Sequence, residues 1–147
     1  MKKNPNLNAA ERSVIAYIAG QLEMDRHFLQ QKFPFIGNVL MRLPTEVTEN
    51  GFPDTAATDG HTIFCNPLFL AGLDEDERQF VLAHEVMHCV MLHRLREKGR
   101  DHQLWNVATD LEIHFILTDS GMKAPFVLPH DPNWKGLSAE EIYEEVL

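Results

Sequence analysis

The sequence is poor in several features that mark particular classes of protein. Its 147 residues include only two cysteines, Cys65 and Cys89, so the disulfide framework of a small secreted domain is excluded. Acidic residues outnumber basic ones by 22 to 13, and the net charge of −9 argues against binding to nucleic acid, which needs a basic face. The same charge argues against an anionic membrane surface as the main partner. No apolar run reaches the roughly 18 residues of a membrane-spanning helix.

The N-terminus also lacks the pattern of a secretory signal. The start, MKKNPNLNAAERS, has lysines but no apolar segment behind them, so we expect a cytoplasmic protein. A hydrophobic content of 44% is ordinary for a globular chain, and the length fits one compact domain over residues 1–147. Eight histidines are many for this length and are the first indication of metal chemistry.

Capping residues and apolar spacing predict most of the helices. The predicted helices are one over about 9–31 after the capping box Asn8/Glu11, a short one from Ile36 to Leu43 that stops at Pro44, a long one over 75–98 between Asp74 and Gly99, one between Asp101 and Gly121, and a short one after the capping box Ser138/Glu141.

The middle of the chain changes character and predicts strands. It is rich in Thr, Gly and Pro, and we expect strands near 45–49, 54–58 and 61–66. The dipeptide Asp59-Gly60 suits a type I′ turn between the last two. Residues 122–137 have no clear period and are expected to be mostly loop. The predicted fold class is therefore α+β, with a small, mostly antiparallel sheet.

The segment VLAHEVMHCVMLH, residues 81–93, places polar residues inside an apolar helix. His84, Glu85 and His88 spell H-E-x-x-H, so both histidines stand on one helix face, about 6 Å apart. Two imidazoles placed in this way can bind one zinc ion, and Glu85 flanks them where a general base for zinc-bound water is expected. The alternative is a pair of core histidines. Without a metal, however, two buried histidines and a glutamate leave a costly charge and unpaired polar groups.

A catalytic zinc needs a third protein ligand and an open position for water. His93 follows His88 by five residues, nearly 500° of helical rotation, so it leaves the helix face of the two ligands. No glycine between His88 and Gly99 bends the helix, as it does in the metzincins. We therefore expect His93 to support the site or to be structural.

A better third ligand lies in the next predicted helix. Asp110 stands in the apolar stretch LWNVATDLEIHFIL, where an ionised carboxylate needs a compensating cation. Zinc would supply that charge, and an ion pair with an arginine such as Arg94 is the alternative. Asn106 and His114 share the helix face of Asp110 and can orient the ligands. His114 and, less well placed, Glu112 are rival third ligands. Two neutral histidines and one carboxylate leave a zinc complex with a net charge of about +1, which favours a lowered pKa of bound water.

Four segments in order, TDGHTIFCNPLFL, LAHEVMHCVMLHRLR, LWNVATDLEIH and LSAEEIYEEVL, carry a family resemblance. The chain resembles the putative metallopeptidase domain of bacterial proteins, closely from about Asp59 to Leu147 and more loosely before it. The resemblance implies a minimal gluzincin-like zincin fold, one Zn²⁺ held by His84, His88 and Asp110, and Glu85 as the base. Members tend to have Asn at the position of His114, which leaves a role of His114 at the metal open. In the family this domain is commonly followed by a von Willebrand A-like domain, so the chain can be the N-terminal part of a longer protein or act with such a partner.

These observations predict zinc-dependent hydrolysis of a peptide or protein substrate. Glu85 would take the proton of the zinc-bound water and pass it to the leaving amine. A substrate strand could add to the edge of the hairpin 54–66, and Tyr143 or His130 could stabilise the oxyanion.

Two other readings are open. One is a catalytically inactive, zinc-stabilised interaction or regulatory domain, for which a fourth protein ligand such as His114 would fill the open position. The other is a di-iron helical protein, because Glu85 and His88 also form E-x-x-H. That class needs a second E-x-x-H on another helix, and the sequence contains none.

Overall fold

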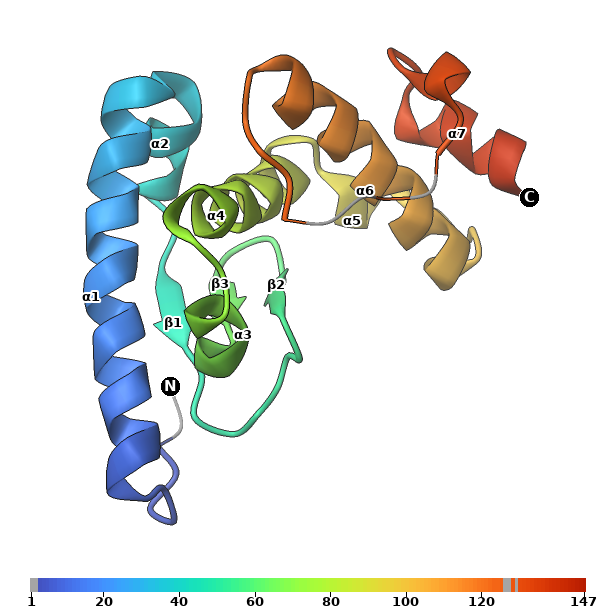
Figure 1. The fold of residues 1–147 in the computed structure, drawn as a ribbon. Helices are drawn as coiled ribbons and strands as arrows, with labels where there is room; N and C mark the ends of the chain where they lie inside the picture. Colours follow the sequence, from blue (N-terminus) through green and yellow to red (C-terminus); the bar gives the residue numbers. More distant parts are fainter. Residues whose placement is uncertain (1–2, 126–127, 129) are drawn as a thin grey trace.

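The computed structural model describes residues 3–125, 128 and 130–147. Within them the chain forms an α+β fold with seven α-helices, one 3₁₀ turn and a three-stranded sheet (Figure 1). The helices are α1 Ala9–Lys32, α2 Pro34–Leu40, α3 Pro67–Ala71, α4 Glu75–Val90, α5 His93–Arg96, α6 His102–Asp119 and α7 Ala139–Val146. The strands are β1 Thr45–Val47, β2 Ala56–Thr58 and β3 Ile63–Cys65, and the 3₁₀ turn is Pro132–Trp134. No helix among the described residues combines the length and the apolar character needed to cross a bilayer.

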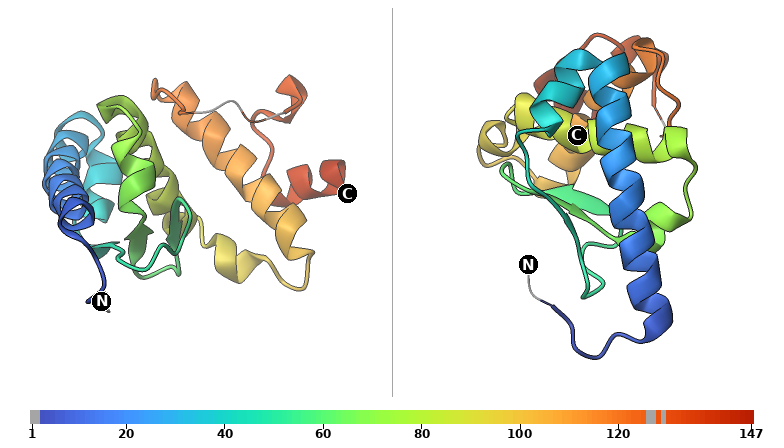
Figure 2. Two further views of the ribbon diagram at one scale, coloured as in Figure 1. Left: turned by 60° about the horizontal axis from the view of Figure 1, so that its bottom comes forward. Right: turned by 90° about the vertical axis from the view of Figure 1, so that its left-hand side faces the viewer.

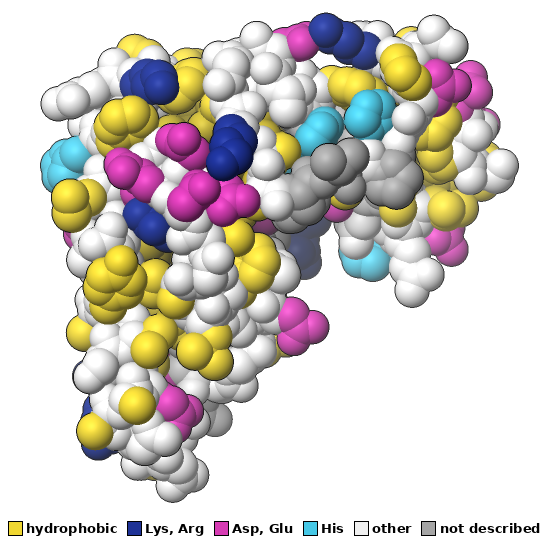
Figure 3. All heavy atoms as spheres, in the orientation of Figure 1, with side chains coloured by type: hydrophobic (Ala, Val, Ile, Leu, Met, Phe, Trp, Pro, Cys, Tyr) yellow, Lys and Arg dark blue, Asp and Glu magenta, His cyan; other side chains and the backbone are white. Residues whose placement is uncertain are grey.

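Helices α1, α4, α6 and α7 begin where the sequence predicts them, whereas α2 begins at Pro34 and not at Ile36, and α3 was not predicted. Asn8, Asp74 and Ser138 each cap a helix and exchange hydrogen bonds with a glutamate three residues on, so the two predicted capping boxes are confirmed and Asp74 with Glu77 forms a third. Asp101 caps α6 by accepting from the N–H of Leu104. Acidic side chains also gather where α4 begins (Figure 3), and they stabilise the positive end of the helix dipole. Of the predicted loop 122–137, residues 126, 127 and 129 lie outside the described residues.

The sheet is mixed, so the prediction of a mostly antiparallel sheet is wrong. Its strand order is β1-β3-β2, with β3 parallel to β1 and antiparallel to β2. After β1 the chain forms β2 and then returns as β3, which lies between β1 and β2. Strand β2 is therefore an edge strand of the sheet. The predicted type I′ turn is also wrong, because φ is positive at Gly60 but not at Asp59. Instead the Asp59 carboxylate accepts from the N–H groups of His61 and Thr62.

The long predicted helix over 75–98 is broken. Helix α4 ends at Val90, and Leu92 takes a left-handed conformation with φ of 55° before the short α5 begins at His93. The chain therefore changes direction directly after the H-E-x-x-H segment. The expectation for His93 assumed a straight helix, and this bend changes where His93 lies.

The larger hydrophobic core joins α1, α2, the sheet and α4, with residues such as Ile18, Leu40, Ile63 and Leu82 fully buried. A buried ion pair connects α1 to α4 beside this core. Asp25 and Arg78 are 1% and 6% exposed, and the guanidinium Nε lies 2.9 Å from the carboxylate. Because each charge neutralises the other, loss of one partner would leave a costly buried charge.

A second, smaller core joins α6 to α7 around Trp105, Leu111 and Ile142. Figure 2 shows α6 and α7 on one side of α4, and α1 and α2 on the other. Helix α6 takes part in both cores, because Ile113 and Leu117 belong to the larger one. Helices α4 and α6 thus face each other between the two cores.

Candidate metal centre

Helix α4 supplies two histidines to the space between α4 and α6. His84 and His88 are one helical turn apart, and their rings meet edge to face with centroids 4.7 Å apart. Their Nε2 atoms are 3.1 Å apart. The neighbours Leu82, Ala83 and Val86 are fully buried, so core packing fixes the helix that carries the two rings.

Asp110 on α6 completes a triangle of donor atoms. Its Oδ1 lies 3.0 Å from Nε2 of His84 and 3.2 Å from Nε2 of His88. Burial raises the pKa of the Asp110 carboxyl, but the hydrogen bonds and charges of the two histidines outweigh burial and hold that pKa well below its usual range. Asp110 is therefore an anion at neutral pH. Its partners are these histidines, and no ion pair with Arg94 occurs among the described residues.

The triangle fits a metal ion. Ligands held tetrahedrally at about 2.0–2.1 Å from an ion stand about 3.3–3.4 Å apart. The three sides observed here are 3.0, 3.1 and 3.2 Å, close to that spacing. Two ring nitrogens and a carboxylate oxygen that converge in this way repel one another unless a cation or protons lie between them. The donor set, two imidazoles and one carboxylate, is one that divalent metals bind.

Glu85 is buried beside the triangle. Only 7% of the residue is exposed, and burial raises the pKa of its carboxyl to about 7. The charge of His88 lowers this pKa and that of Asp110 raises it further, both by less than burial does. The ligand atoms of His84, Glu85 and His88 lie within 4.8 Å of one another. A carboxylate with a pKa near 7 is suited to accept and return a proton.

These side chains open onto a cleft of about 580 Å³. Glu85, the two histidines and Asp110 line it, together with the edge strand β2 and the first half of α6. The surface is visibly indented between the α1–α4 part and the α6–α7 part of the molecule (Figure 3). The triangle is therefore accessible from the cleft, since the side chains of His84, His88 and Asp110 are 15%, 19% and 41% exposed.

A comparison with protein-family models identifies the family to which the chain belongs. The model described as "Putative metallopeptidase domain" matches residues 20–147, most of the chain. The chain belongs to this family. Searches of curated proteins and of solved structures gave no significant match. Membership implies a metal ion, and the group His84, Glu85 and His88 could bind one.

His93 contacts His88 on the side of the ring that faces away from the triangle. Its Nδ1 is 3.1 Å from Nδ1 of His88, the ring nitrogen that points away from Asp110, and its Nε2 is 2.7 Å from Oε1 of Glu112. Burial lowers the pKa of His93, although the hydrogen bond with Glu112 opposes this. Glu112, which the sequence offered as a rival ligand, thus contacts His93 and not the triangle. Glu112 was a candidate because it is a carboxylate in an apolar stretch, but no local pattern indicates its partner.

The remaining candidates from the sequence contact other groups. Asn106 is exposed, and its amide nitrogen lies 3.4 Å from His102. His114 packs edge-on against Phe80, and its Nδ1 is buried with no hydrogen-bond partner among the described residues. Burial lowers the pKa of His114, with smaller contributions from two neighbouring histidines. Neither Asn106 nor His114 forms a hydrogen bond with the triangle in the described part of the chain.

The two oxyanion candidates do not line the cleft. The Tyr143 hydroxyl accepts from the backbone N–H of Asp101, and its ring packs against Trp105. The His130 ring lies against His114 and Phe115, and its Nδ1 is 2.6 Å from the carbonyl oxygen of Leu128. A role for either residue in the reaction would require the chain to move.

Proposed function

We propose that this domain is a zinc metallopeptidase of the zincin type, in which His84, His88 and Asp110 hold one Zn²⁺ and Glu85 is the general base. The observation that carries the proposal is the donor triangle with a buried carboxylate beside it, in a cleft of about 580 Å³. Membership of the metallopeptidase family supports the same chemistry.

The bound zinc would supply Lewis acidity that polarises a carbonyl group and makes water more acidic. Glu85 accepts the proton of the attacking water and delivers it to the leaving amine. Burial that raises its pKa to about 7 lets Glu85 act in both directions near neutral pH. Asp110 adds one negative charge to two neutral imidazoles, so the ion keeps a net positive charge.

The edge strand β2 is the proposed docking element for the substrate backbone. The N–H of Asn66 donates to the carbonyl of Thr55, which makes these two residues a hydrogen-bonded pair of the antiparallel ladder. Because such pairs alternate, the backbone groups of Ala56 and Thr58 point away from β3, towards the cleft that they line. An extended peptide can pair with these groups and lie across the triangle.

The proposal is tested by metal analysis and peptide cleavage with one pair of variants. Wild type should hold one zinc per chain and cleave an unfolded protein such as casein. Glu85→Gln should keep the zinc and lose about 10²- to 10⁴-fold in cleavage rate, because the general base is gone. Glu75→Gln removes a carboxylate from the exposed start of the same helix and should cleave as wild type does.

Three results would contradict this function in different ways. Wild type without stoichiometric metal would show that the triangle is not a metal site. Equal cleavage by wild type and Glu85→Gln would remove Glu85 from the reaction. Zinc binding with no cleavage of any substrate would favour the inactive interaction domain.

A downstream von Willebrand A-like partner is a further proposal that rests on the family resemblance alone.

A further inference from the structure

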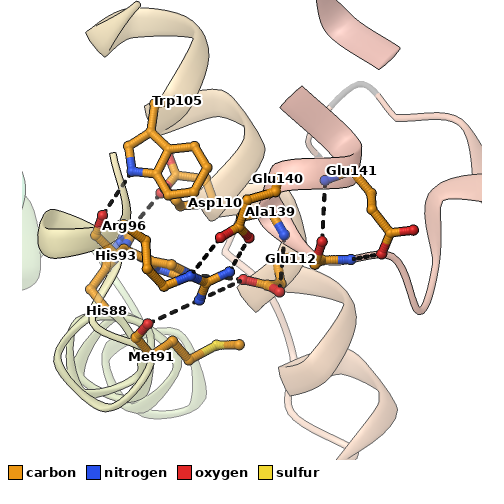
Figure 4. Close-up of polar contacts among 12 residues, drawn as sticks. His88, Met91, His93, Arg96, Trp105, Asp110, Glu112, Ala139, Glu140 and Glu141 are labelled. Atoms are coloured by element: carbon orange, nitrogen blue, oxygen red, sulfur yellow. Dashed lines mark hydrogen bonds and ion pairs between the residues drawn. The ribbon is translucent and has the colours of Figure 1, made fainter. Parts of the chain in front are cut away.

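A line of buried polar contacts leads from the triangle to the C-terminal helix. It runs from His88 to His93, on to Glu112, and ends at the backbone N–H of Ala139, the first residue of α7 (Figure 4). The three contacts measure 3.1, 2.7 and 3.0 Å. His93 is 3% exposed and Glu112 is 7% exposed, so no solvent water competes freely for these hydrogen bonds.

The bend after α4 is what makes the first contact possible. On a continuous helix His93 would stand about 140° round the axis from His88. The left-handed conformation of Leu92 ends the helix and turns α5 so that the two Nδ1 atoms face each other. The indole N–H of Trp105 donates to the carbonyl of His93 over 2.8 Å and fixes the backbone there.

The positions of the imidazole protons of His88 and His93 follow from Glu112, the hydrogen-bond acceptor farthest from the triangle in this line of contacts. A neutral imidazole carries one proton, on either nitrogen. The N–H of Ala139 donates to Oε2 of Glu112, and Arg96 lies 4.0 Å from Oε1, so both oxygens of Glu112 face donor groups and act as hydrogen-bond acceptors. His93 then donates from Nε2 to Glu112, and its Nδ1 is left as an acceptor. Only His88 can supply the proton of the Nδ1–Nδ1 contact.

When a metal ion takes the place of the proton that His88 shares with Asp110, this arrangement leaves Nε2 of His88 without a proton. That atom is the one that faces Asp110 and His84. Metal ligation requires a free lone pair at this nitrogen, and a metal-bound histidine usually donates its other N–H to an acceptor that fixes its tautomer and orientation. Here the acceptor is a second histidine, which a carboxylate orients in turn.

We propose that Glu112 and His93 are positioning residues that hold His88 in its metal-binding tautomer, and that α7 belongs to the site because its first N–H anchors Glu112. The proposal rests on the proposed metal centre and names residues that support it. A merely structural role for the buried His93–Glu112 pair would affect folding stability but not the affinity for metal.

The first test compares zinc affinities, measured by competition with a chromophoric chelator. Glu112→Gln keeps the shape of the side chain but removes the charge that orients His93. We expect its zinc affinity to fall about 10- to 100-fold, the usual effect of losing such a partner. Glu140→Gln is the matched control, because it loses the ion pair between α7 and Arg96 without touching His93. Its affinity should stay within about 3-fold of wild type.

The second test uses wild-type protein and needs no variant to fold. Long-range ¹H–¹⁵N NMR spectra of the imidazoles should show His93 protonated at Nε2 and not at Nδ1. In the zinc-loaded protein His88 should be protonated at Nδ1. We call the hydrogen-bonded line from Glu112 through His93 to His88 the relay. A proton on Nδ1 of His93, or unchanged zinc affinity in Glu112→Gln, would overturn it.

The outcomes separate the relay from the proposed function. Zinc binding that does not depend on Glu112 removes the relay and leaves the peptidase proposal intact. The expected affinities and tautomers without any cleavage of peptides remove the peptidase function and leave the relay intact. If wild type binds no zinc, the metal centre is wrong and the relay falls with it.

Discussion

Leu92 is a single residue on which the arrangement of the site depends. It is 56% exposed, so it contributes little to either core, and its φ of 55° lies in the left-handed region. This conformation costs a residue with a Cβ roughly 1–2 kcal/mol. The cost is tolerated because the turn at Leu92 brings His93 to His88 and lets α5 lead the chain back to α6.

Replacement of Leu92 by its isomer isoleucine should increase the free-energy cost of the left-handed conformation. Leu92→Ile leaves the number of atoms unchanged but puts a branched Cβ into the left-handed region, where it is least tolerated. We expect a loss of about 1 kcal/mol in the free energy of unfolding, or about 2–4 °C in Tm for a chain of this size. Leu95→Ile is the control, because Leu95 is 72% exposed in α5 and should lose only a few tenths of a kcal/mol. Denaturant unfolding of both variants checks the difference, and equal losses would contradict it.

The residues of the site differ in how far the sequence can predict them. His84, Glu85 and His88 form the local motif H-E-x-x-H. Asp110 can be predicted as a ligand because it is a carboxylate in an apolar helix. The place of His93 could not be predicted, because no Gly or Pro near Leu92 signals the bend. The anchor of Glu112 is a backbone N–H, a group that every residue except proline carries, so its partner is visible only in the fold.

At the scale of elements, Gly37 sets the distance between α1 and α2. A Cβ at this position would lie 2.2 Å from Cα and 2.4 Å from N of Gln30, both backbone atoms that cannot move alone. The close approach lets Leu29 and Leu40 become fully buried in the larger core. Gly20, in the middle of α1, has no such neighbour, because nothing lies within 4 Å of the position of its Cβ.

The two glycines should therefore respond to alanine in opposite directions. Gly37→Ala should destabilise the protein by about 3 kcal/mol, since the helices have to separate to accept the methyl group. Gly20→Ala should stabilise it by about 0.5–1 kcal/mol, because alanine has the higher helix propensity and reduces the entropy of the unfolded chain. Thermal unfolding monitored by circular dichroism checks both signs. A Gly37→Ala protein as stable as wild type would show that α1 and α2 do not pack this closely.

The link between α5 and α7 should make stability depend on pH. Hydrogen bonds from Arg96 hold the pKa of Glu140 down to about 2, although burial opposes this. A lowered folded-state pKa stabilises the protein above the unfolded-state pKa of about 4.3, and this stabilisation is lost as the pH falls towards 2. The Glu140 side chain is 36% exposed, so we expect only about 1 kcal/mol after screening by solvent.

The experiment compares wild type with Glu140→Gln in urea at pH 7 and at pH 2.5. Wild type should be the more stable by about 1 kcal/mol at pH 7, and most of the difference should disappear at pH 2.5. Glu144→Gln removes a charge from the same helix, on an exposed residue, and should show no such change with pH. A constant difference across this range would mean that the ion pair with Arg96 is not the cause.

The sheet shows what local sequence signals leave open. Each strand lies close to its predicted position, because alternating apolar residues and turn residues are local features. The pairing of β1 with β3 joins residues such as Thr45 and Ile63, which are 18 positions apart, and no local pattern specifies it. The family resemblance predicted the class of site, but the parallel pairing had to be seen in the structure.

At the scale of the whole molecule, the donor triangle lies between the two cores, which helix α6 also connects through Ile113 and Leu117. His84 and His88 stand on α4, which belongs to the larger core, and Asp110 stands on α6 between Ala108 and Leu111 of the smaller one. The cleft runs along the same boundary. An ion at the triangle would therefore add a further link between α4 and α6, beside the packing of Ile113 and Leu117 in the larger core.

This position predicts that metal stabilises the whole domain against unfolding. A ligand that binds only the folded state, at a free concentration of 100 times its Kd, adds about 2.7 kcal/mol. For a chain of this size we expect Tm to rise by about 5–10 °C when zinc is added to chelator-treated protein. His88→Ala should abolish the rise, because it removes one corner of the triangle. His102→Ala is the matched control, since His102 lines the same cleft with a side chain that is 73% exposed and lies outside the triangle. A rise in Tm that persists in His88→Ala, or one that disappears in His102→Ala, would show that the metal binds elsewhere in the cleft.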